Sequence, residues 1–247
     1  MSATGARREL EFSSFLASKP NASSVDFVVN SIKELLLNRN VLPGDRLPAE
    51  TELSKLLAVS RGSVREAMKV LSALGIVEVK RGDGTYVSNR GGEAVFDPLL
   101  FSMIVSQPKF AELKELRLIL EKNVVRLAIQ NAGDDDLLAL RQCFEKMRAL
   151  KKGDGENDEE LLASDLEFHR ILGQACRNGP LETLYKFVMQ YFKSYIAQSL
   201  RNNTSPSRES TRVHKKILLA VEGRDVREAE RAVEESMEVW EYLVFKR

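Results

Sequence analysis

The sequence has few cysteines and no long apolar run. Its two cysteines, Cys143 and Cys176, lie in apolar or helical surroundings without a partner motif. Small exported domains rely on disulfides, so this sparse usage favours a reducing, cytoplasmic environment. The longest charge-free stretch of note, Pro98 to Pro108, is far shorter than the roughly 20 apolar residues that cross a bilayer. Two arginines near the start are followed by acidic residues and by no apolar segment, so we expect neither a signal peptide nor a membrane partner.

The charge balance is nearly neutral but unevenly distributed. The whole chain carries a net charge of +1. Residues 1–90 hold 13 Lys and Arg against 10 Asp and Glu, a net +3, and the remaining residues hold 24 against 26, a net −2. This asymmetry weakly favours a nucleic-acid partner for the first third of the chain. The positions of the basic residues are therefore needed to judge whether this part binds nucleic acid.

The first third of the sequence has the order of a winged helix-turn-helix. Residues 1–22 are polar and lack periodicity, and we interpret them as a mobile N-terminal arm. Apolar spacing then predicts three helices and two short strands within residues 23–88. The helices are expected at 24–36, 49–58 and 60–74, with Gly75 as a stop, and the strands at 76–80 and 85–87 around a glycine-containing turn.

The rest of the chain is predicted to be helical. Residues 89–97 have the composition of a linker, and residues 98–247 are expected to form an all-α bundle of six or seven helices. Glycine, proline and asparagine breaks place the helices at roughly 110–131, 134–152, 158–177, 180–201, 207–222 and 225–243. The fold class is therefore mostly α, with a small β-hairpin in the first domain.

The third predicted helix has one apolar and one basic side. Arg61, Arg65 and Lys69 stand at i, i+4 and i+8 and share a stripe that could face DNA phosphates and guanine edges. A solvated helix face is the alternative. The hairpin that follows carries Lys80 and Arg81, and this combination favours DNA binding. Ser60 and Ser63 compete as the N-cap, and Ser63 to Glu66 fits a capping box.

Four successive motifs resemble the GntR family of repressors. They are Leu47-Pro48-Ala49-Glu50, Leu56-Leu57-Ala58-Val59-Ser60-Arg61, Val64-Arg65-Glu66-Ala67-Met68 and Gly82-Asp83-Gly84-Thr85-Tyr86-Val87. The resemblance implies a DNA-binding regulator that acts on double-stranded operator DNA. It implies DNA contacts from Ser60, Arg61, Gly62, Ser63, Arg65 and Gly82, to which we add Arg81. Thr51 stands where the fatty-acid-responsive member has a DNA-contacting arginine, so the operator sequence is open.

The second domain is similar to the FCD domain of the FadR-like branch. Three signatures carry the resemblance: Glu115-Leu116-Arg117 with Glu121, Asp165-Leu166-Glu167-Phe168-His169, and Val213-His214-Lys215-Lys216-Ile217. It implies a homodimer, a small carboxylate effector and, in many members, a divalent metal that holds the effector. The chain is thus expected to be an effector-controlled regulator, most simply a repressor, that binds an inverted-repeat operator as a dimer.

The two histidines of the chain are candidate metal ligands. Asp165 and His169 are four residues apart and share a helix face, and a carboxylate and an imidazole so placed suit Zn, Ni or Mn. Histidines in a hydrogen-bonded core are the alternative. The resemblance adds His214 to the set, but Ser236 replaces the last histidine of metal-binding relatives. Two histidines and one carboxylate would hold an ion weakly, or the pocket is metal-free.

Arg117 and Asn178 are the candidate effector contacts. In a metal-free pocket, Arg117 could bind a carboxylate by a bidentate contact. A structural ion pair with Glu121, one helical turn away, is the equally open alternative.

Two other classes of function are alternatives for this sequence. A metal-dependent hydrolase is disfavoured because the sequence has no His-Asp doublet, no nucleophile elbow and no glycine-rich phosphate loop. We therefore expect no enzymatic activity. A DNA-binding architectural protein without an effector is the other alternative, and it would show no ligand-induced change in stability or DNA affinity.

Overall fold

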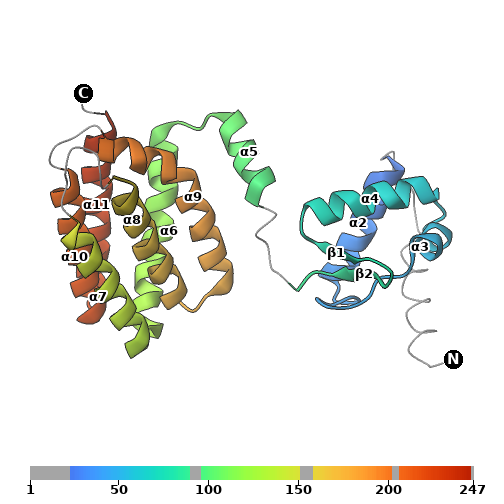
Figure 1. Ribbon diagram of the computed structural model, residues 1–247, viewed down its shortest axis with the longest axis horizontal. Coiled ribbons are helices and arrows are strands. Elements are labelled where there is room, and N and C mark those ends of the chain that lie inside the picture. The colour runs from blue at the N-terminus through green and yellow to red at the C-terminus, as the bar shows by residue number, and fades with distance from the viewer. Residues whose placement is uncertain (1–22, 90–95, 151–157, 202–205, 246–247) are drawn as a thin grey trace. The chain divides into compact units, whose positions relative to one another are not determined.

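The computed structural model describes residues 23–89, 96–150, 158–201 and 206–245. The chain divides into two compact units, residues 1–102 and 103–247 (Figure 1). The mostly helical fold class predicted above is confirmed. The expected N-terminal arm, residues 1–22, and most of the expected linker lie outside the described residues.

The first unit contains three helices and a hairpin in the predicted order. The helices are α2 (Ser24–Leu37), α3 (Glu50–Leu56) and α4 (Arg61–Ala73), and the strands are β1 (Val77–Lys80) and β2 (Gly84–Val87). The strands are antiparallel, with Val77 opposite Val87 and Lys80 opposite Gly84. Gly75 ends α4 with a φ of 68°, a conformation that glycine adopts without strain.

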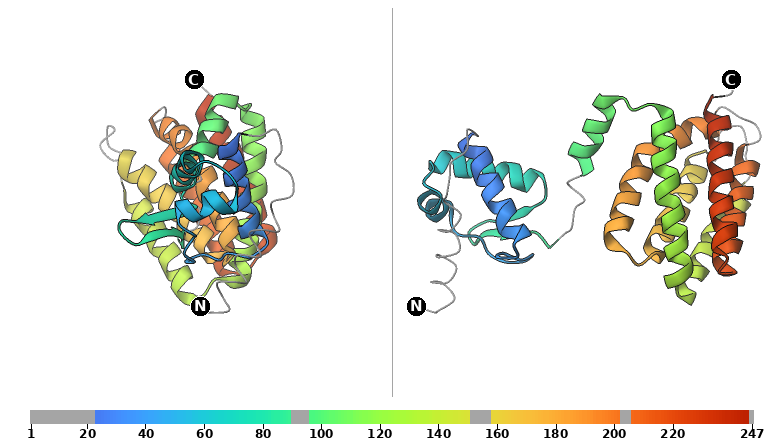
Figure 2. Two further views of the ribbon diagram at one scale, coloured as in Figure 1. Left: turned by 90° about the vertical axis from the view of Figure 1, so that its right-hand side faces the viewer. Right: turned by 180° about the vertical axis from the view of Figure 1, so that it is seen from behind.

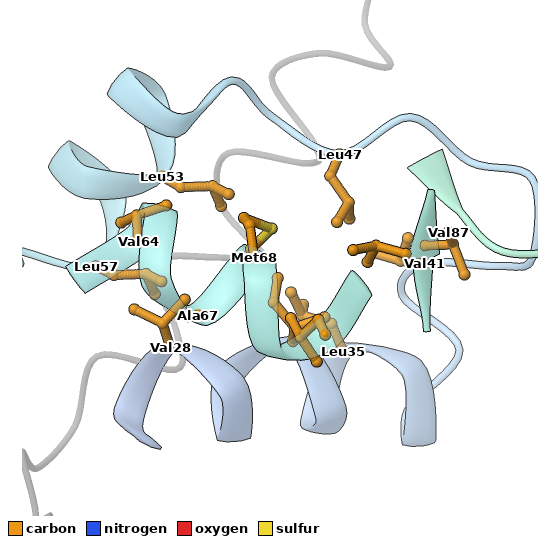
Figure 3. Packing of buried hydrophobic residues seen from close by; sticks show 13 residues of the cluster. Val28, Leu35, Val41, Leu47, Leu53, Leu57, Val64, Ala67, Met68 and Val87 are labelled. Carbon is orange, nitrogen blue, oxygen red and sulfur yellow. The ribbon is translucent and has the colours of Figure 1, made fainter. Parts of the chain in front are cut away.

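The core of this unit lies between one face of α2 and one face of α4. Val28 and Leu35 of α2 point toward Val64, Ala67 and Met68 of α4, and Leu53 of α3 closes the same cluster (Figure 3). Fully burying a side chain of this size contributes about 1.5–3 kcal/mol, so the apolar stripe fixes how α4 is rotated. The opposite face of α4 is therefore left in solvent.

Serine side chains begin both long helices of this unit. Ser23 Oγ accepts a hydrogen bond from the Asp26 amide at 3.1 Å, and Ser60 Oγ accepts one from the Ser63 amide at 3.0 Å. The competition between Ser60 and Ser63 is thus decided for Ser60, because α4 begins at Arg61. The capping box predicted from Ser63 to Glu66 is wrong, since Ser63 lies in the first turn.

The second unit is a helical bundle. Its long helices are α6 (Phe110–Asn131), α7 (Asp134–Ala149), α8 (Asp158–Ala175), α9 (Gly179–Arg201), α10 (Pro206–Glu222) and α11 (Val226–Phe245). Figure 2 shows them side by side, and α6 packs against α8, α9 and α11. Leu172, Phe192 and Ile217 are among the side chains that fill the interior. No helix in the described ranges has the length and apolarity to cross a membrane.

One helix was not expected from the sequence. The segment α5 (Phe96–Ser106) begins inside the predicted linker, so the assignment of Phe96 and Asp97 to that linker is wrong. The helix runs across the division between the two units. Most of its residues are apolar, and its three polar residues, Asp97, Ser102 and Ser106, are too few to mark out a polar face, so the segment gives no helical periodicity to detect.

Candidate functional sites: an exposed basic helix and a buried polar cluster

The basic face of α4 is exposed, as the sequence pattern predicts. Arg61, Arg65 and Lys69 are all exposed, and they lie on a different side of α4 from the buried Val64 and Leu71. The two serines at the start of α4 face each other, with 2.8 Å between their hydroxyl oxygens. Hydroxyls and unpaired amides at a helix N-terminus bind phosphate readily, so this end of α4 presents both donors and positive charge.

Arg65 differs from its neighbours on this face because it has an acidic partner. Its Nε donates to Oε2 of Glu50 in the first turn of α3 at 3.2 Å. Arg61 and Lys69 have no ion-pair partner among the residues that the structure describes. Sequence reasoning missed this role of Glu50, because the two residues are brought together only by the packing of α3 on α4.

The tip of the β-hairpin is exposed to solvent, and two side-chain hydrogen bonds to Asp83 hold it in place. Arg81 and Gly82 are exposed, and no atom lies within 4 Å of the place where a side chain on Gly82 would begin. Arg46 donates to the carbonyl oxygen of Asp83, and the Tyr86 hydroxyl donates to the carboxylate of the same residue at 2.9 Å. These two hydrogen bonds brace the hairpin, which is the wing of the winged helix-turn-helix. The remaining predicted contacts, Thr51 and Gly62, are also exposed.

The second site is buried among the long helices of the FCD-like unit. Asp165 and His169 of α8 meet His214 of α10, and one ligand atom of each lies within 4.8 Å of the others. His169 is fully buried and His214 is 3% exposed. The Nε2 atoms of the two rings are 3.3 Å apart, and Asp165 Oδ1 is 3.4 Å from Nε2 of His214. The structure thus brings together the three residues that the sequence singled out.

The donor atoms of this cluster fit a divalent cation. His214 Nδ1 lies 2.7 Å from the Ser210 carbonyl oxygen, which can only accept, so Nδ1 carries the hydrogen and Nε2 keeps a lone pair. One ion can reach both Nε2 atoms, because their 3.3 Å separation is less than the roughly 4 Å that two Zn–N bonds in line would span. Asp165 Oδ2 is buried without a hydrogen-bond partner among the described residues, which suits a metal-bound carboxylate.

Arg117 lies beside these ligands and is almost completely buried. Its Nε donates to Glu121 Oε2 at 3.1 Å, and Nη2 is 3.4 Å from His169 Nε2. The guanidinium also stacks near the rings of Phe192 and Trp240. The ion pair with Glu121 that the sequence left open is therefore present. Nη1 nevertheless has no hydrogen-bond partner among the described residues, so the guanidinium keeps a buried donor for an anionic group.

Tyr185 of α9 completes the cluster and was not foreseen. Its hydroxyl lies 2.6 Å from His169 Nδ1, and its ring is buried. Burial holds the pKa of His169 well below its usual range, and it raises the pKa of Tyr185 well above its usual value. Both groups are therefore neutral near pH 7, and neutral imidazole is the form that binds metals. No spacing rule links residues 169 and 185, since they lie on different helices.

Ser236 and Asn178 are the two remaining residues that the sequence assigned to this site. Ser236 of α11 is buried, and its approach to the cluster stays a prediction. Asn178 is exposed, and its Oδ1 accepts a hydrogen bond from the Leu181 amide at 3.1 Å, which caps the start of α9. The structure thus gives Asn178 a capping role, and its contact with an effector stays a prediction.

Both halves of the chain match known family models. The model described as "Bacterial regulatory proteins, gntR family" matches residues 24–87, and that of the FCD domain matches residues 112–239, just over half of the chain. The chain belongs to the GntR family and carries an FCD domain. The branch is FadR-like, as the sequence motifs indicated.

Individual GntR relatives extend the likeness over most of the chain. LutR of Bacillus subtilis is 30% identical over 167 residues, which are 68% of this chain and 73% of that protein. The Uxu operon transcriptional regulator of Escherichia coli is 29% identical, with 86% of this chain and 80% of that protein covered. A solved structure of Streptococcus agalactiae GntR superposes with a TM-score of 0.59 at 28% identity, over 87% and 97% of the two chains.

The GntR assignment decides between the classes of function that the sequence left open. The matched family and the relatives are transcription regulators, so the chain is a regulator and not an enzyme. The winged helix-turn-helix and the FCD domain are the two parts expected of a DNA-binding protein that answers to a small molecule.

Proposed function

We propose that this GntR regulator binds an inverted-repeat operator as a homodimer and represses transcription until a small carboxylate binds its FCD domain. The exposed basic face of α4, next to a braced wing, is the observation that carries the proposal. The helix face and the wing belong to one rigid unit with a continuous core, so they can meet adjacent parts of one duplex.

Arg61 and Arg65 are proposed to read bases, and the wing is proposed to hold the DNA backbone. A guanidinium can donate two parallel hydrogen bonds to O6 and N7 of guanine, the most common specific contact in the major groove. Ser60, Ser63 and the amide of Gly62 stand at the start of α4, where they would contact phosphate. Arg81 at the wing tip adds a positive charge without base specificity.

The effector is proposed to bind beside Arg117. Its unpartnered Nη1 provides a charge-assisted donor for a carboxylate, and Glu121 holds the guanidinium through Nε. Asp165, His169 and His214 would hold a Zn, Ni or Mn ion with water in the remaining positions. When bound, such an ion supplies a positive charge to which an effector carboxylate oxygen can bind. A metal-free pocket, in which Arg117 alone binds the anion, is the alternative.

Selection of binding sites from random DNA, followed by titration of the selected operator, tests the DNA-binding part. Arg65→Ala should lower operator affinity by about 1–3 kcal/mol and relax the preference at one base pair. Lys33→Ala removes the same charge from the exposed side of α2 and should change the affinity far less. Unchanged operator affinity in both Arg61→Ala and Arg65→Ala would contradict the proposal, as would a strictly monomeric protein in sedimentation.

A thermal-shift screen of small carboxylates and sugar acids, with and without divalent metals, tests the effector part. A ligand at 100 times its dissociation constant should stabilise the protein by about 2.7 kcal/mol. Calorimetry on Arg117→Ala with the ligand so found then separates the two roles of the arginine. Lost ligand affinity supports the effector contact, and retained affinity with lower thermal stability shows a purely structural arginine.

A further inference from the structure

We propose that Tyr185 is a positioning residue for the metal site: its hydroxyl holds His169 in the tautomer whose Nε2 lone pair faces His214 and Asp165. The role of this tautomer rests on the metal binding proposed above. The tautomer itself is a property of the metal-free protein and can be measured there. It starts from the shortest contact of the His169 ring, the 2.6 Å between Nδ1 and the Tyr185 hydroxyl.

The groups around His169 place its hydrogen on Nδ1. On the Nδ1 side lie the Tyr185 hydroxyl and Glu121 Oε1, the latter at 3.5 Å and without a hydrogen-bond partner among the described residues. On the Nε2 side lie His214 Nε2 at 3.3 Å, Nη2 of Arg117, which can only donate, at 3.4 Å, and Asp165 Oδ2 at 3.8 Å. A hydrogen on Nε2 would point at the Arg117 donor and would occupy the space between the two Nε2 atoms where a cation could bind. It would also leave Glu121 Oε1 without a nearby N–H. The arrangement therefore favours an N–H at Nδ1 and a lone pair at Nε2.

Two lone pairs then face one another across the cluster. His214 is fixed in the same sense by the Ser210 carbonyl oxygen, so both Nε2 atoms are ligands for a cation. A metal-binding histidine commonly donates its other N–H to a neighbouring group, which fixes the ring and raises its basicity. For His214 that group is a backbone carbonyl, and for His169 it is the Tyr185 hydroxyl.

Gly173 provides an independent reason to assign Tyr185 a defined position. A Cβ at residue 173 would lie 3.1 Å from Cδ1 of Tyr185 and 3.8 Å from Cε1, so the ring rests against the bare backbone of α8. Glycine inside a helix is less favourable than alanine by about 0.5–1 kcal/mol. Gly173 lies one helical turn after His169. Because it has no side chain, the Tyr185 ring can approach the backbone of α8 closely at this point.

Tyr185→Phe removes only the hydroxyl and tests the inference directly. We expect the affinity for Zn²⁺ or Ni²⁺ alone, measured by competition with a chromophoric chelator, to fall about 10–100-fold. Tyr191→Phe makes the same change on the same helix, at a half-buried ring that is not part of the cluster, and should leave the affinity unchanged. Equal losses in the two variants, or no loss in Tyr185→Phe, would overturn the inference.

Nitrogen NMR of histidine-labelled protein at pH 8 provides a readout that needs no metal. The chain has only two histidines, so each ring can be followed separately. In the wild type, His169 should be protonated at Nδ1, and in Tyr185→Phe the population should shift toward the Nε2–H form. Unchanged populations would overturn the inference. A wild type that binds no metal but shows the expected shift would contradict the metal part of the proposed function alone.

Gly173→Ala supplies the second variant. The added methyl should displace the Tyr185 ring by a few tenths of an ångström and lower metal affinity in the same direction, by less than Tyr185→Phe. In the Tyr185→Phe background the glycine substitution should have no additional effect on metal affinity, because the hydrogen bond between the Tyr185 hydroxyl and His169 that the displaced ring would weaken is already gone. Additive losses would show that Gly173 acts independently of the tyrosine hydroxyl, which would contradict its part in the argument.

Discussion

Ser236 is the position at which this chain departs from the metal-ligand set that the FCD resemblance implies. It is buried on α11, at the place where the resemblance predicts a histidine ligand. A neutral hydroxyl cannot match an imidazole lone pair that binds Zn or Ni at about 2.0–2.1 Å. If Ser236 faces Asp165, His169 and His214, the wild type is one ligand short and holds an ion weakly.

We expect Ser236→His to raise metal affinity, because it restores a nitrogen ligand to the cluster. Competition with a chromophoric chelator measures the change, and His169→Ala should abolish whatever binding the wild type has. Ser236→Leu introduces a side chain of comparable bulk without a ligand atom and should not raise the affinity. Equal affinities in the wild type and Ser236→His would mean that residue 236 does not face the cluster.

Glu50 is the residue that we expect to influence how Arg65 reads DNA. Because Glu50 takes the Nε hydrogen, the two terminal nitrogens of Arg65 remain free to donate to one guanine. The ion pair is exposed, and exposed pairs contribute about 0.2–1 kcal/mol, so its loss should be a matter of a few fold.

Glu50→Gln should therefore lower the ratio of operator affinity to non-specific affinity by less than about tenfold. Its non-specific affinity should rise slightly, because a negative charge near the phosphates is lost. Glu52→Gln is the matched control, since it removes the same charge from the first turn of α3. Glu52→Gln should raise the non-specific affinity to a similar extent as Glu50→Gln and leave the ratio of operator affinity to non-specific affinity unchanged. A fall in the ratio in both variants would contradict a specific role for Glu50.

At the level of elements, the helix α4 and the hairpin are expected to contribute differently to DNA binding. Arg81 is exposed at the wing tip, and within the described ranges no hydrogen bond or ion pair fixes its guanidinium. Arg81→Ala should weaken binding by a similar factor on every DNA sequence and reduce the slope of log affinity against log salt by about one. Titrations of operator and random DNA at several salt concentrations measure both. A loss confined to the operator would show that the wing reads bases.

The elements also show what the sequence can predict. Helices α2 and α4 follow from their one-sided apolar spacing, and the hairpin follows from its glycine turn, because these signals are local. The helix α5 was missed because it has no polar side, and the ends of α7 and α8 were placed two or three residues too late. Local patterns fix where an element lies, and end positions depend on caps and on tertiary contacts.

The same distinction applies to the buried cluster. Asp165 and His169 could be paired from the sequence because residues four apart share one face of a helix. His214 joined them only through a family resemblance, since no spacing rule spans α8 and α10. Tyr185, Ser210 and the unpartnered donor of Arg117 depend on how α6, α9 and α10 pack together, and side-chain packing between helices is not written in any local pattern.

At the level of the whole molecule, the two units are expected to divide the work of operator binding. The first unit has a core of its own, formed by α2, α3, α4 and the hairpin, so we expect residues 1–90 to fold without the bundle. The proposed dimer contacts belong to the FCD domain. Each winged helix in the full protein would then be held near the second half-site by its partner.

The fragment 1–90 should bind the inverted repeat much more weakly than the full chain does. Linking two half-site contacts makes the second one intramolecular, and this gain in effective concentration can reach about 100-fold or more. Titration of both proteins on a single half-site supplies the control, because there the fragment and one arm of the full chain make the same contacts and should bind alike. Only the full chain should gain when the second half-site is added at the right spacing. A fragment that binds the complete repeat as tightly as the full chain would show that dimerisation does not reside in the helical domain.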